Sequence, residues 1–102
     1  MKFQLVLQFS TAEMEQLDEL MALEEDLIQN LPSTSEVDGH DFGSGELNIF
    51  IVTDQPREAF DAARSVIQRG SFMDQLRAAY RQQGKEEYVI LWPEHLEQFR
   101  VV

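Results

Sequence analysis

Residues 38–50, DGHDFGSGELNIF, hold most of the side chains with which this chain could do chemistry. Four of them are of types that ligate hard or borderline cations: Asp38, His40, Asp41 and Glu46. Asp38 and His40 are two residues apart, so on a strand they would point to the same face. The segment is therefore a candidate for a weak ion or ligand site. Of the two interpretations we favour a plain β-hairpin that turns at Gly43-Ser44-Gly45.

This segment lacks the sequence motifs of known metal, phosphate and catalytic sites. The acids do not alternate as in a calcium loop, and no HExxH zinc motif is present. The GSG turn leads from strand to strand, so it offers no helix N-terminus to a phosphate and lacks the spacing of a nucleophile elbow. The chain has no cysteine, which excludes thiolate metal sites and cysteine nucleophiles. We predict no cofactor and assign no catalytic residue.

The charge of the chain is strongly negative and unevenly distributed. The formal net charge is −11, with eleven acids and one base in residues 1–51 but eight acids and seven bases in residues 52–102. An acidic surface repels phosphate backbones and anionic lipids, so we expect the chain to bind neither nucleic acid nor membrane. A basic protein is compatible with this charge, although acids of this kind also serve solubility alone.

The N-terminal half predicts a strand followed by an acidic helix. Residues 3–9 alternate apolar and polar, and Ser10 with Glu13 forms a capping-box pattern for a helix to Asn30. The helix has an apolar stripe made by Met14, Leu17, Leu20, Met21, Leu27, Ile28 and Leu31. The opposite side carries five acids that we take as candidate partner-binding residues: Glu15, Asp18, Glu19, Glu25 and Asp26. Glu24 falls within the apolar stripe, and we expect it to pair with Arg64.

The remaining helices and strands are predicted from hydrophobic periodicity and from the positions of proline and glycine. We predict strands over 36–42, 46–53 and 88–92, and a helix that starts at Pro56 with Phe60, Ala63 and Ile67 facing inward. Gly70-Ser71 interrupts that helical region. A second helical piece, with Met73, Leu76 and Tyr80 inward, is expected to continue to Gly84, either as one bent helix or as two.

This order predicts an α+β fold of the ferredoxin-like split βαβ type (βαββαβ), with residues 1–102 forming one compact domain and a short C-terminal extension. Both helices would cover one sheet face and leave the other open. Large apolar side chains on an open face indicate either a homodimer or cover by the chain's own tail, Phe99 to Val102.

The stretch DGHDFGSGELNIFIVTD, with Pro56 after it and YVILWPE near the end, resembles a group of small bacterial proteins of uncharacterised function. Their signature reads D-G-x-x-x-G-x-G-x-x-N-I-F-I-x-T-D-x-P. The resemblance covers residues 38–94 and implies a recurrent hairpin, without any catalytic residue. In composition alone, the chain also resembles acidic toxin-immunity proteins.

The sequence supports two hypotheses about function. The first is a small, acidic, non-enzymatic interaction module that binds or neutralises a basic protein through its helix. The alternative is a ligand- or metal-sensing regulatory domain that uses the Asp38–Glu46 hairpin. Gln4 and Gln8 interrupt the N-terminal apolar run and no cleavage site follows, so we expect a cytoplasmic protein.

Overall fold

The computed structural model describes residues 1–10 and 15–101, with Glu15 described by its backbone only. The predicted contact of Glu13 with Ser10 and the predicted inward position of Met14 lie outside these residues. The elements along the chain are β1 (Phe3–Ser10), α1 (Glu15–Asn30), β2 (Ser35–Gly43), β3 (Glu46–Thr53), α2 (Pro56–Ile67), η1 (Met73–Gln75), β4 (Leu76–Gln82) and β5 (Val89–Trp92).

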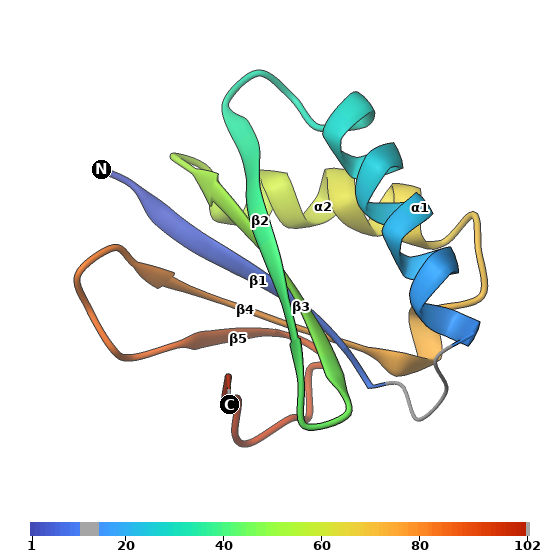
Figure 1. Cartoon of the computed structure of the whole chain (residues 1–102). Helices are drawn as coiled ribbons and strands as arrows, with labels where there is room; N and C mark the ends of the chain where they lie inside the picture. The colour runs from blue at the N-terminus through green and yellow to red at the C-terminus, as the bar shows by residue number, and fades with distance from the viewer. Residues whose placement is uncertain (11–14, 102) are drawn as a thin grey trace.

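All five strands form one antiparallel sheet in the order β2-β3-β1-β4-β5. The central strand β1 pairs with β3 on one side and β4 on the other, while β2 and β5 form the edges. The helices α1 and α2 lie together against one face of this sheet (Figure 1). The C-terminal segment, residues 96–101, turns back beside the sheet away from the helices. We call the face opposite the helices the back face.

The β2–β3 hairpin confirms the predicted turn. Gly43 pairs with Glu46, so Ser44 and Gly45 are the two central residues, with φ values of 54° and 74°. Two consecutive left-handed residues are what a tight hairpin turn needs to match the twist of its strands. Gly45 adopts this conformation without steric cost, and Ser44 accepts it as one of the short polar residues.

The hydrophobic core lies between the helices and the sheet. On β1 the predicted alternation is present, and it places Leu5, Leu7 and Phe9 toward the helices. The inward residues predicted for α2, which are Phe60, Ala63 and Ile67, are all buried in this core. One residue of the predicted α1 stripe is misplaced: Ile28 is 53% exposed, and Leu23, which we had not assigned to the stripe, is buried instead.

The predicted second helical piece is wrong. Residues 73–75 form one 3-10 turn, and residues 76–82 form β4 between β1 and β5. Leu76 and Tyr80 are four residues apart, a spacing that keeps two side chains on one side of either a helix or a strand. The Ala-rich sequence favours the helix locally. Pairing with β1 along seven residues supplies hydrogen-bond partners that override this preference.

Because of this change the described part of the chain is α+β with two α-helices and five strands, and the predicted four-strand βαββαβ order is not confirmed. The tail does not add a strand among residues 93–101. No helix in the described part of the chain is long and apolar enough to cross a membrane.

Neighbouring residues on α1 provide a test of this core. We expect Leu27→Ala to lower the free energy of unfolding by about 2–5 kcal/mol, because Leu27 is fully buried. The matched change Ile28→Ala should cost about 1 kcal/mol or less, because this side chain is half exposed. Urea unfolding followed by circular dichroism measures both. Equal losses would show that the helix is rotated relative to this description.

Candidate functional site

The four hairpin residues predicted as ligands do not converge. His40 is paired with Ile49 and so lies on the helix side of β2, whereas Asp41 is paired with Asn48 and lies on the back face. Asp38 occupies the bulge between Val37 and Gly39. In residues 1–10 and 15–101, no group of three or more His, Asp or Glu side chains could hold a metal ion.

Two of these residues have partners within the chain. His40 Nδ1 lies 3.0 Å from both carboxylate oxygens of Glu24, so β2 is tied to α1 at this point. Glu46 Oε2 lies 3.6 Å from the Arg77 guanidinium on the back face. The expected pairing of Glu24 with Arg64 is therefore wrong. The bulge is what turns His40 toward α1, because an extra residue in an antiparallel strand shifts the alternation of its side chains.

Arg64 has other neighbours. Its guanidinium lies 5.8 Å from the Phe60 ring and 5.7 Å from the Trp92 ring, and 3.9 Å from the Asp61 carboxylate. It thereby links α2 to β5 by cation–π contacts. Arg57 lies in the same way over Tyr80, and Arg81 over Tyr88. These three arginines of the C-terminal half contact aromatic rings and form no ion pair with a described acid of α1.

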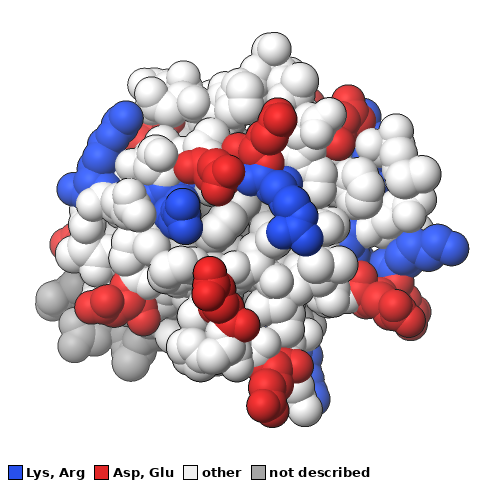
Figure 2. Space-filling view, turned by 180° about the vertical axis from the view of Figure 1, so that it is seen from behind, with Lys and Arg blue, Asp and Glu red and all other residues white. Residues whose placement is uncertain are grey.

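The acids predicted on the outer side of α1 are exposed. Asp18, Glu19, Glu25 and Asp26 all lie on the surface, and none of the four is in an ion pair with a described residue. The Glu15 side chain lies outside the described residues. Seen from behind, Lys and Arg side chains lie among Asp and Glu side chains, and neither sign forms a continuous patch (Figure 2).

A groove of about 300 Å³ adjoins this acidic side, between α1 and the turn that follows α2. Glu19 and Asp26 are on its α1 wall and Arg69 is on the other. Its remaining lining is largely apolar: Ala22, Leu23, Val66, Ile67, Gly70, Ser71 and Phe72. The groove brings two of the predicted partner-binding acids next to apolar side chains, an association that the spacing along α1 alone did not indicate.

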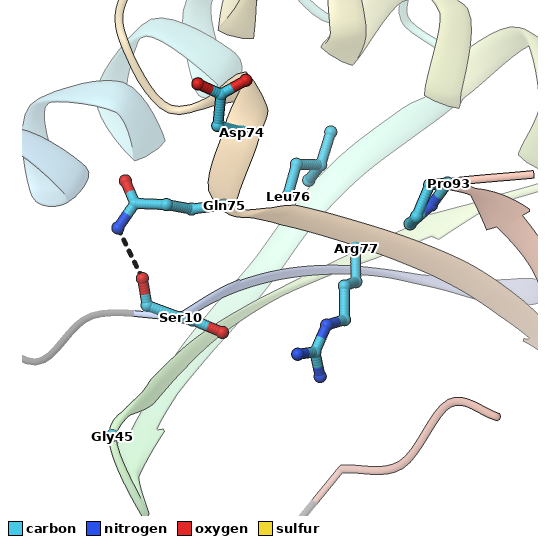
Figure 3. Close-up of a pocket in the computed structure, with 7 residues that line it drawn as sticks. All are labelled: Ser10, Gly45, Asp74, Gln75, Leu76, Arg77 and Pro93. Atoms are coloured by element: carbon cyan, nitrogen blue, oxygen red, sulfur yellow. Dashed lines mark hydrogen bonds between the residues drawn. The ribbon is translucent and has the colours of Figure 1, made fainter. Parts of the chain in front are cut away.

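A second cavity, of about 580 Å³, lies at the end of the sheet where β1 stops and β4 starts (Figure 3). Gln75 Nε2 donates a hydrogen bond of 2.6 Å to the Ser10 carbonyl and one of 3.2 Å to Gln16 Oε1. Arg77 extends into it from β4, and Asp74 lies on the opposite side of Gln75. The Gln75 contacts connect η1 to the end of β1 and to α1. We therefore assign these residues a structural role.

The back face has an unusual polar centre. Gln8 on β1 and Asn48 on β3 are each only 1% exposed, and Gln8 Nε2 lies 3.0 Å from Asn48 Oδ1. The same Gln8 nitrogen lies 2.8 Å from the backbone carbonyl of Arg100. The C-terminal segment therefore covers the centre of the back face. Cover by the tail was one of the two alternatives predicted for this face, and a homodimer was the other. Buried amides need such partners, because an unpaired amide inside a protein is costly.

A third groove, of about 600 Å³, remains between this segment and the sheet. It is lined by Gln4 on β1, Phe50 on β3 and Arg81 on β4, together with Glu86, Tyr88, Phe99, Arg100 and Val101. The sequence predicted Arg81 in a helix and gave no sign that these residues meet, since they are brought together only by sheet order and the path of the tail.

Comparison with known proteins finds no family model, no curated protein and no solved structure that matches this chain. The functional argument therefore depends on the geometry above.

The tail contact can be tested through Gln8. We expect Gln8→Ala to lower the free energy of unfolding by about 1–3 kcal/mol, because it leaves the Asn48 and Arg100 oxygens without this donor. It should also release the C-terminal segment, so that trypsin cleaves after Arg100 faster than in the unaltered protein. Urea unfolding and mass spectrometry of the digest measure the two effects. Gln98→Ala, at an exposed position of the same segment, is the control and should change neither.

Proposed function

We propose that this chain is a small protein-interaction module that binds a basic protein through the acidic side of α1. The observation that supports it best is the exposure of Asp18, Glu19, Glu25 and Asp26 without an ion-pair partner in the described chain. A basic partner would neutralise these charges and would be steered toward them during encounter.

The groove beside α1 supplies the apolar part of such a contact. Charged rims speed association and select partners, whereas affinity comes mainly from apolar anchors that are fully desolvated. Leu23 and Phe72 line the groove next to Glu19 and Asp26. A partner with one apolar side chain flanked by lysines or arginines would match this arrangement. Neutralisation of a basic toxin, the immunity-like form of this hypothesis, is one case of it.

The position of Glu25 and Asp26 adds a stability argument. Both lie toward the C-terminal end of α1, whose last turn contains no basic residue. Carboxylates at this end interact unfavourably with the helix dipole. Residues that cost stability and make no compensating ion pair are candidates for a role outside the chain.

The ligand- or metal-sensing alternative has less support at the hairpin itself, because His40 and Glu46 are engaged by Glu24 and Arg77. As for the fold, we propose a ferredoxin-like relationship with an added edge strand. Its support is the order β2-β3-β1-β4 within the sheet and the two helices on one face.

A pull-down with charge-matched variants tests the proposed function. We expect a basic protein to be captured by the unaltered chain and lost with Asp18→Asn/Glu25→Gln/Asp26→Asn, because these changes remove three of the exposed acids of α1. Capture should also weaken as salt is raised, since salt screens surface charges. Quantitative mass spectrometry of the eluates from source lysate measures the loss.

The control is Glu58→Gln/Glu87→Gln/Glu94→Gln, which removes three exposed acids elsewhere and leaves the same total charge. It should retain the partner. Equal capture by both variants, or equal loss from both, would contradict a role for α1.

The same acids that should strengthen partner binding are expected to weaken the fold, so neutralising them should stabilise the protein. Glu25→Gln/Asp26→Asn should raise the free energy of unfolding by about 0.3–1 kcal/mol at low salt, and by less at high salt, because it removes charges that oppose the helix dipole. Urea unfolding at two salt concentrations measures this gain. A loss of stability would mean that the two acids make favourable contacts within the chain.

A further inference from the structure

The groove beneath the C-terminal segment has the size of a small-molecule site and is lined by both aromatic and charged side chains. Its volume of about 600 Å³ lies within the range of ligand pockets, which combine apolar walls with a few fixed polar groups. Three aromatic rings line it: Phe50, Tyr88 and Phe99. The Tyr88 and Phe99 rings have centroids 5.0 Å apart at an interplanar angle of 57°, so they form one continuous aromatic wall.

The polar groups of the groove are mostly cationic. Arg81 is held in place by its Nε, 3.0 Å from Gln4 Oε1, by Nη1, 3.3 Å from the Lys85 carbonyl, and by the Tyr88 ring at 5.5 Å. A guanidinium has five N–H groups, so these two hydrogen bonds leave three for a ligand. Arg100 is anchored through its backbone by Gln8, while its side chain is exposed.

Among the described residues that line the groove, Glu86 is the single acid, against two arginines. We propose that this groove binds a small aromatic anion, with the ring system against the aromatic wall and a carboxylate, sulfonate or phosphate on Arg81 and Arg100. Arginine forks suit planar or tetrahedral oxyanions and can bind them through two hydrogen bonds.

The negative charge of the whole chain does not prevent this. The acids of α1 belong to the helix layer, and the groove lies on the opposite face of the sheet. Charges that are separated by more than about 8 Å are largely screened at physiological ionic strength. A long polyanion would extend beyond the groove over a chain whose formal net charge is −11, so a small anion fits better than a nucleic acid.

The probe for this site is 1-anilinonaphthalene-8-sulfonate, an aromatic anion that fluoresces when it leaves water. With the full chain we expect saturable binding at one site. Arg100→Gln should weaken it about three- to fivefold, in line with an exposed ion pair. Arg81→Gln should weaken it about tenfold, in line with charge-assisted hydrogen bonds from a less exposed group. Near-ultraviolet circular dichroism of each variant ensures that the dye reports on folded protein.

The matched control is Arg69→Gln, which removes one exposed positive charge in the groove beside α1 and leaves the same net charge as Arg100→Gln. It should not change binding. The uncharged dye N-phenyl-1-naphthylamine should bind at least fivefold more weakly than the sulfonate, because it lacks the anion that the arginines would hold.

Equal binding of the two dyes, an effect of Arg69→Gln as large as that of Arg100→Gln, or unaltered binding by the Arg81 and Arg100 variants would each overturn the proposal. Competition against the bound dye then separates sources of the anion. Displacement by AMP indicates an aromatic phosphate, and displacement by 4-hydroxyphenylacetate indicates an aromatic carboxylate. Displacement by neither compound contradicts the site.

Discussion

The structure depends on the pairing of β1 with both of its neighbours. β1 is hydrogen-bonded to β3 along eight residue pairs and to β4 along seven, so it has no free edge. Leu5, Leu7 and Phe9 reach the helix side, while Val6 and Gln8 are buried on the other. A strand that is buried on both faces must satisfy every polar group it carries, and Gln8 does so through Asn48 and the Arg100 carbonyl.

This constraint connects the two faces of the molecule. The core on the helix side fixes where α1 and α2 lie, and so it fixes the acidic side of α1 and the groove beside it. The amide pair on the back face needs an acceptor from the C-terminal segment. That segment in turn brings Phe99 to Tyr88 and closes the groove that contains the arginines. Both proposed sites are consequences of how β1 is buried.

The charges divide in the same way. Arg57, Arg64 and Arg81 are placed over aromatic rings, and these contacts hold the C-terminal half together. Asp18, Glu19, Glu25 and Asp26 of α1 form no ion pair within the described chain. Exposed acids without ion pairs leave a charged surface free for another molecule. The proposed partner of α1 and the proposed ligand of the back face have opposite charges and lie on opposite sides of one sheet.

The sequence by itself determined the elements whose pattern has a single period. Strands β1 and β3, helices α1 and α2, and the turn at Ser44-Gly45 follow from alternation, helical spacing, Pro56 and glycine. Only the tertiary structure decided the state of residues 76–82, because the spacing of Leu76 and Tyr80 fits a helix and a strand alike. It also decided that His40, and not Arg64, faces Glu24, since the bulge at Asp38, two residues earlier in β2, changes the alternation. The groove beside α1 and the groove on the back face were also decided only by the tertiary structure. Their walls come from residues far apart in the chain, and hydrophobic periodicity carries no information about which distant segments will meet.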